Sequence, residues 1–180
     1  MMKKLAALFL ALIMLVTLAA CGGGADDAEI LSELSALAPR ATELYRIIYG
    51  DSLSHGEADE YGYCQVTADA VFSSVDALDV AMREVFYYDY YKILANTAFY
   101  GVAADEGEIG AKFIEKDGVM YVNPTVTEHF GEPREFDLTE AKVIKKNPYM
   151  AIVRIPHVDG DVEVTLQKTE EGWQINSPLF

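Results

Sequence analysis

Three turn signals in the C-terminal half of the sequence restrict the fold most strongly: Asp117-Gly118, Asp159-Gly160 and Glu171-Gly172. An Asp-Gly pair is typical of a tight β-hairpin turn, because both central residues of that turn need a positive φ. Around these pairs apolar and polar residues alternate with the period of two that a half-buried strand shows. We therefore predict antiparallel hairpins in this half of the chain. The expected strands are 112–115, 119–122, 136–146, 152–157, 162–167 and 173–175.

Residues 28–100 show apolar side chains at spacings of three and four, which indicate helices. Pro39 is expected to open a helix, because the first turn tolerates its missing N–H, and Gly50 is expected to end that helix. Ser73-Ser74 is expected to cap a later helix. We predict helices over 28–37, 39–49, 75–86 and 88–100, a loop over 51–60 and a short strand over 61–67.

Helices that precede a series of hairpins indicate an α+β fold. We expect the N-terminal helices to pack on one face of a curved antiparallel sheet, in two layers. Residues 28–180 show no internal repeat and no second linker, so they are predicted to form a single domain.

The N-terminus has the pattern of an export signal. Lys3 and Lys4 precede an uncharged run, residues 5–20, which is shorter than the roughly 20 residues of a membrane-spanning helix. The following Leu18-Ala19-Ala20-Cys21 resembles the lipobox of bacterial lipoproteins. That resemblance implies removal of residues 1–20, a diacylglyceryl group on the Cys21 sulfur and a flexible tether over 21–27. It also implies a place at the cell membrane, anchored through Cys21 on the extracytoplasmic face. The alternative is a secreted protein with an incidental cysteine.

Charge restricts the partners of the mature chain. Removal of residues 1–20 leaves a net charge of about −17, compared with −15 for the whole sequence. Nucleic-acid binding depends on cationic contacts to phosphates, so no nucleic-acid partner is expected. The excess of negative charge favours cationic partners or neutral ligands. After lipidation of Cys21, Cys64 is the one remaining thiol. An internal disulfide is then impossible, and we expect Cys64 to be a buried core residue.

Several segments resemble a known family. The ending Gly172-Trp173-Gln174-Ile175-Asn176-Ser177-Pro178 is similar to the close of NTF2-like (cystatin-like) domains of Gram-positive lipoproteins. The segments FSSVDAL…MREVF and FIEKDGVMYVNP resemble small clostridial-type envelope lipoproteins of unassigned function. The resemblance implies helices packed on a sheet. A more distant likeness is to secreted inhibitors of wall-cleaving endopeptidases, from which no inhibitory residue can be carried over.

No motif for catalysis or cofactor binding is present. The three histidines, His55, His129 and His157, do not have the spacing of metal ligands. The acidic run 105–108 could hold calcium, but it lacks the alternating ligands of an EF-hand loop, and a solvated loop is the preferred interpretation. We therefore predict no catalytic residue, no cofactor and no metal site.

The most conspicuous stretch is aromatic: residues 86–91 read FYYDYY, and Phe99-Tyr100 follows. Tyrosine offers a flat apolar face with a hydroxyl, which suits sugars, peptides and protein interfaces. Packing of helix on sheet explains the same residues, and their spacing favours it. Tyr88 or Tyr90 is predicted to be the exposed member, and the two are the candidate ligand or partner surface.

These features favour a lipid-anchored extracytoplasmic binding or regulatory domain, whose ligand is an envelope protein or a small neutral molecule. One alternative is an enzyme of the NTF2-like isomerase or hydratase type, with a carboxylate and a tyrosine in its pocket. A second alternative is an inhibitor of wall-cleaving endopeptidases. A third is a structural partner domain within a larger membrane complex.

Overall fold

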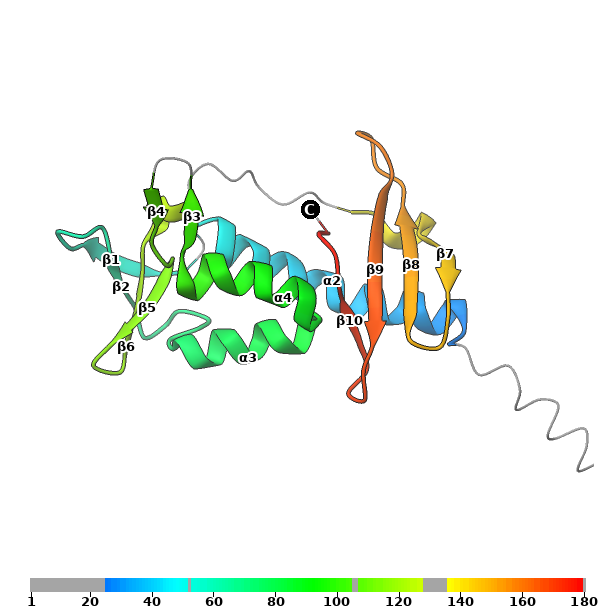
Figure 1. The fold of residues 1–180 in the computed structure, drawn as a ribbon, viewed down its shortest axis with the longest axis horizontal. Helices are drawn as coiled ribbons and strands as arrows, with labels where there is room; N and C mark the ends of the chain where they lie inside the picture. The colour runs from blue at the N-terminus through cyan, green and yellow to red at the C-terminus, as the bar shows by residue number, and fades with distance from the viewer. Residues whose placement is uncertain (1–24, 52, 105–106, 128–135, 180) are drawn as a thin grey trace, which may run out of the picture.

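The computed structural model describes residues 25–51, 53–104, 107–127 and 136–179. Within these ranges three α-helices pack against antiparallel sheets (Figure 1), so the expected α+β class is confirmed. Cys21 and the predicted signal lie outside the described residues. The helices are α2 (Asp27–Tyr49), α3 (Val75–Val85) and α4 (Tyr88–Ala95), and a π-helical turn, η1 (Asn96–Tyr100), continues α4.

Helix α2 runs without a break where two helices were expected. Pro39 lies inside it, so the prediction that Pro39 opens a new helix is wrong. The buried stripe continues across the proline, and Pro39 itself lies on the exposed face, where its ring does not disturb the core. Burial of this stripe outweighs the roughly 3 kcal/mol that an interior proline costs a helix. The stripe comprises Ile30, Leu34, Leu37, Ala41, Leu44, Ile47 and Ile48.

The first sheet has the strand order β1-β2-β6-β5. The hairpin at one edge of this sheet, formed by β5 and β6, turns at Asp117-Gly118, where φ is 53° and 75° respectively, so the predicted hairpin turn is confirmed. Residues 55–58 form an exposed edge strand where a loop was expected. The strands are β1 (His55–Ala58), β2 (Cys64–Val66), β5 (Phe113–Lys116) and β6 (Val119–Val122).

The second sheet has the order β10-β9-β8-β7, a meander of sequential neighbours. Both further turn signals join paired strands, as predicted, although only the glycine of each pair has a positive φ, 116° at Gly160 and 133° at Gly172. The strands are β7 (Lys142–Lys146), β8 (Met150–Ile155), β9 (Val162–Lys168) and β10 (Trp173–Ile175). Short 3-10 helices, η2 (Pro124–Thr127) and η3 (Leu138–Glu140), and a hairpin, β3 (Val102–Ala104) with β4 (Gly107–Ile109), complete the described elements.

The hairpins thus form two four-stranded sheets instead of one curved sheet. Helix α2 contacts β7 and β10 of the second sheet, and α3 contacts β5 of the first sheet and β10 of the second (Figure 1). The end of α3 is fixed to β10, because Tyr87 donates its backbone N–H to the carbonyl of Ile175 at 2.9 Å. Helix α3 therefore joins the two sheets, and a single cluster of buried side chains runs through both.

Candidate functional site

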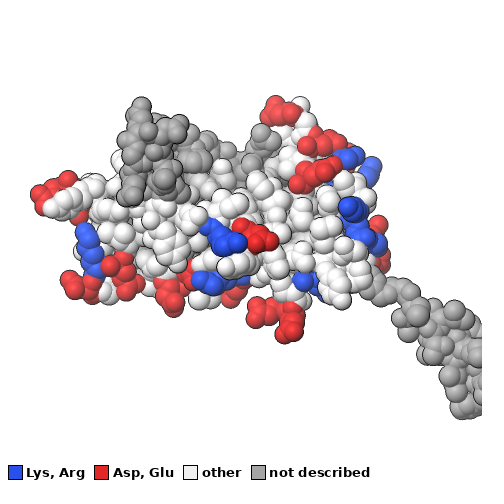
Figure 2. Space-filling model, in the orientation of Figure 1, with Lys and Arg blue, Asp and Glu red and all other residues white. Residues whose placement is uncertain are grey.

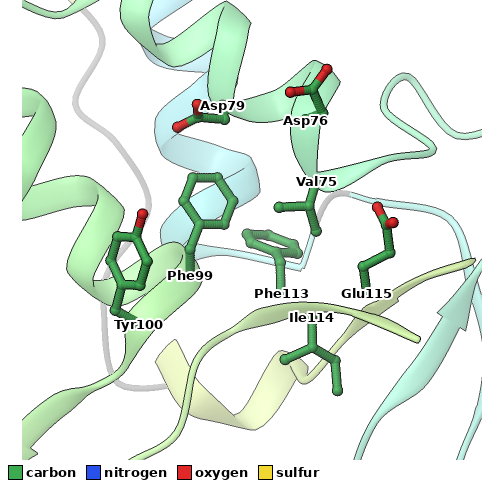
Figure 3. Close-up of a pocket in the computed structure, with 8 residues that line it drawn as sticks. All are labelled: Val75, Asp76, Asp79, Phe99, Tyr100, Phe113, Ile114 and Glu115. Carbon is green, nitrogen blue, oxygen red and sulfur yellow. The ribbon is translucent and has the colours of Figure 1, made fainter. Parts of the chain in front are cut away.

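A cavity of about 530 Å³ opens where the start of α3, the π-helical turn η1 and strand β5 meet (Figure 3). We call this cavity the α3–β5 groove. It lies between helices and a sheet. Concave sites of this size, with apolar walls and a few polar groups, are typical of ligand binding.

Local sequence signals orient α3 toward the groove. Ser74 caps the helix, and its Oγ accepts a hydrogen bond from the backbone N–H of Ala77 at 3.2 Å, as predicted. Leu78, Met82 and Val85 form the buried stripe of α3. Their burial fixes the rotation of the helix about its axis. The carboxylates of Asp76 and Asp79 therefore reach the groove instead of the core.

The opposite walls come from η1 and β5. Phe99 and Tyr100 lie in the turn that ends at Gly101, whose φ of 79° suits glycine. On β5, alternation puts Phe113 and Glu115 on one face. Figure 3 shows the rings of Phe99 and Phe113 between α3 and β5, with Ile114 pointing the other way. Phe113 is buried and its ring centroid lies 6.4 Å from that of Phe99. Aromatic rings thus form the floor of the groove.

Asp79 is held by two neighbours. Nε of Arg83 lies 2.7 Å from Oδ2 of Asp79, and the hydroxyl of Tyr91 donates to Oδ1 of the same carboxylate. Arg83 also donates from Nη2 to the Tyr91 hydroxyl at 2.7 Å, and its guanidinium lies 4.5 Å from the centroid of that ring. Burial, followed by the hydrogen bond to Asp79, raises the pKa of Tyr91 to about 12. The charge of Asp79 is therefore balanced by Arg83, and the Tyr91 proton stays on its oxygen at neutral pH.

Asp76 and Glu115 carry the unbalanced charge of the groove. Both side chains are exposed, and neither forms an ion pair within the described part of the chain. They lie on different elements, α3 and β5, at the rim above the aromatic floor. The groove therefore combines an apolar floor with a negatively charged rim.

The two tyrosines of the predicted surface have different environments. Tyr88 is exposed (62%), as predicted, and Nζ of Lys92 lies 4.4 Å from the centroid of its ring. Tyr90 is buried (7% exposed), so its inclusion in the candidate surface is wrong; its ring packs edge-on against Phe86 at 5.5 Å. Burial raises the pKa of Tyr90 well above its usual value. Neither tyrosine lines the α3–β5 groove. The groove is lined instead by Phe99 and Tyr100, which belong to the same aromatic-rich region but were not predicted as the candidate surface.

The other candidate residues show ordinary contacts. Nε2 of His55 lies 2.9 Å from Oδ1 of Asp51, and Nδ1 of His157 lies 3.7 Å from Oδ2 of Asp159. Cys64 is buried as expected, and burial raises the pKa of its thiol. His129, Asp105 and Glu106 lie outside the described residues. In the ranges described, no group of three or more His, Cys, Asp or Glu residues could hold a metal ion.

A second cavity, of about 430 Å³, lies along the exposed side of α2 near Pro39 and is also lined by Phe136, Leu138 and Leu179. Its lining is mainly apolar, with Arg46 at one side. The helices that the structure describes include none that is both long and apolar enough to cross a membrane.

In comparisons with known proteins, no family model matches the sequence, and no curated protein matches it either.

Proposed function

We propose that the protein is a lipid-anchored binding or regulatory domain at the extracytoplasmic face of the cell membrane, and that the α3–β5 groove is its ligand site. The anchor is supported by the lipobox-like Leu18-Ala19-Ala20-Cys21 at the end of a short apolar run. Two acyl chains on Cys21 would give stable membrane attachment, which one chain does not.

The direction of α2 supports a site held away from the membrane. The helix begins at Asp27, a few residues after Cys21, and its 23 residues span about 35 Å. In Figure 1 its N-terminal end lies beside β7, and its other end lies beside the first sheet. At the N-terminal end, Nζ of Lys146 lies 2.6 Å from Oδ1 of Asp27 and donates to the carbonyl of Ala25 at 3.0 Å. The groove lies toward the other end of α2, where a ligand outside the membrane could reach it.

The observation that carries the proposal is the groove itself: an open cavity with an aromatic floor and charged groups at its rim. Phe99 is only partly buried, and Tyr100 is 72% exposed. Aromatic side chains left open to solvent beside a cavity are typical of recognition surfaces.

The first test examines the anchor. The wild-type protein should partition into detergent, and Cys21→Ala should partition into detergent less, because the sulfur that carries the lipid is gone. The control is the buried Cys64, whose Cys64→Ala variant should still partition into detergent. Equal partitioning of wild type and Cys21→Ala would contradict the lipid anchor.

The second test examines the groove. The immobilised chain is incubated with solubilised cell envelope, and retained proteins and small molecules are identified by mass spectrometry. Tyr100→Ala should lose the retained species. Tyr149→Ala is the matched control, because Tyr149 is as exposed (70%) but follows β7 in the second sheet. If the wild type, Tyr100→Ala and Tyr149→Ala all retain the same species, the groove is excluded as the site. A retained wall-cleaving endopeptidase would instead support the inhibitor alternative.

One observation favours the enzymatic alternative: the hydroxyl of Tyr91 contacts Asp79, which lines the groove. A carboxylate in a pocket and a tyrosine beside it can act as base and hydrogen-bond donor. Here the Tyr91 hydroxyl already donates a hydrogen bond to the Asp79 carboxylate, so catalysis would require this pair to separate when substrate binds. Conversion of a retained small molecule by wild type but not by Asp79→Asn would support this alternative.

A further inference from the structure

We infer that the α3–β5 groove selects an organic cation, an ammonium or guanidinium group carried on an apolar stem. This inference rests on the proposed function, because it names the class of ligand for the same site.

The charges at the rim favour a cation. Asp76 on α3 and Glu115 on β5 are exposed carboxylates without an ion-pair partner among the described residues, whereas Asp79 is balanced by Arg83. A positive group between α3 and β5 is attracted by both unbalanced carboxylates, and an anion is repelled by both. The net charge of −15 for the whole sequence also draws cations toward the molecule from a distance.

The aromatic floor favours an organic cation. The face of an aromatic ring attracts a cation through its quadrupole, and the ring also packs against an apolar stem. The molecule already uses such contacts on neighbouring elements. Nζ of Lys92 lies 4.4 Å from the Tyr88 centroid, and the guanidinium of Arg83 lies 4.5 Å from the Tyr91 centroid. Tyr100, with its exposed ring at the groove, offers the same kind of face to a ligand.

Arg83 determines where the positive group can lie. Its guanidinium is fixed against Asp79 and Tyr91 and repels a second cation on that side. The positive group of the ligand therefore lies between Asp76 and Glu115, and its apolar stem lies over Phe99 and Phe113 (Figure 3). The cavity of about 530 Å³ is large enough for such a stem.

The same chemistry can come from a free amine or from a lysine or arginine side chain of a partner protein. We propose a titration monitored by amide chemical shifts, on the whole chain carrying Cys21→Ala. The probes are hexylammonium, hexanoate and hexanol, which share one stem and differ in charge. A lysine-containing peptide with blocked ends is the fourth probe. Hexylammonium should saturate and should shift amides of α3, η1 and β5, with an affinity at least about tenfold above that of hexanoate.

Variants identify the groups responsible. Asp76→Asn combined with Glu115→Gln should weaken hexylammonium binding about five- to tenfold and should remove most of its salt dependence. The control pair, Asp159→Asn with Glu171→Gln, removes two exposed acids in turns of the second sheet and should leave binding unchanged. An equal loss of hexylammonium affinity in both double variants would overturn the inference, because binding would then depend on the overall charge of the protein.

The probes also separate failure of this inference from failure of the proposed function. Equal shifts in the groove by hexanol and hexylammonium would overturn the cation inference and would leave the groove as a site for neutral ligands. If no probe shifts the amides of the groove, the cation inference is overturned. If Tyr100→Ala also retains the same envelope ligands as the wild type, the groove itself is excluded as the ligand site. Binding of the peptide at least tenfold tighter than hexylammonium would support a partner protein as the source of the cation, and equal binding would support a free amine.

Discussion

The free energy of unfolding should rise between pH 7 and pH 9 because of one buried lysine, Lys112. Its side chain is fully buried (0% exposed) and donates to neutral oxygens, the carbonyl of Gly50 and Oγ1 of Thr127, the latter at 2.7 Å. Burial lowers the pKa of Lys112 from 10.5 to about 8, and the charge of nearby Asp51 offsets part of this effect. The unfolded chain therefore binds a proton that the folded chain releases between these two values.

The magnitude follows from proton linkage. Below pH 8 both states are protonated, and the buried charge lowers the free energy of unfolding by the full amount, about 3.4 kcal/mol for a shift from 10.5 to about 8. As the pH rises above 8, the folded protein loses the proton first and this penalty is relieved. Between pH 7 and pH 9 the relief amounts to about 1.3 kcal/mol.

The assay compares urea unfolding at pH 7 and pH 9 for the wild type and for Lys112→Met, which keeps the length of the side chain without its charge. Burial raises the pKa of Cys64 and Tyr90, so these groups lower the stability at higher pH, but they do so equally in both proteins. The difference in free energy of unfolding between the wild type and Lys112→Met should therefore change by about 1.3 kcal/mol from pH 7 to pH 9. Lys145→Met, at an exposed site on β7, should behave as the wild type does. An identical pH response of wild type and Lys112→Met would refute the reasoning.

Other predictions concern local structure. Pro39→Ala should raise the free energy of unfolding by about 2 kcal/mol in urea unfolding, because Ala restores the N–H that an interior helical position requires; a decrease would show that the proline stabilises α2. Ser74→Ala should lower it by about 1 kcal/mol through loss of the cap of α3, and Ser73→Ala is the control that should leave it unchanged. The Cys64 thiol should react with a thiol reagent at the rate of global unfolding, because burial both shields it and raises its pKa; rapid reaction of the folded protein would contradict its burial.

The elements that could be predicted from the sequence are those with local causes. The Ser74 cap, the buried stripe of α3 and the Asp117-Gly118 turn depend on residues within a few positions of one another, and all are confirmed. The predicted break at Pro39 is wrong because the local signal of a proline takes no account of the tertiary burial that outweighs it. The edge strand 55–58 was missed because its residues are mostly exposed and show no apolar alternation.

The candidate site depends on contacts that are distant in sequence. The groove joins α3, η1 and β5, and the contacts of β5 with α3 and with η1 are not predicted by any local pattern. The same applies to the division of the hairpins into two sheets. The burial of Tyr90 also could not be predicted from the local sequence. The bend before α4 sets the rotation of that helix about its axis, and Tyr90 then packs against Phe86 in the core.

Arg83 connects the groove to the rest of the fold. Its side chain holds Asp79 at the groove, and its backbone carbonyl accepts a hydrogen bond from Nε2 of Gln174 on β10 at 2.6 Å. Because β10 also packs against α2, the position of the groove is tied to the helix that leads back to the proposed membrane anchor. A site held in this way has little conformational freedom to lose when a ligand binds, which favours affinity. Loss of the Gln174 contact, as in Gln174→Ala, should therefore weaken ligand binding even though Gln174 does not line the groove.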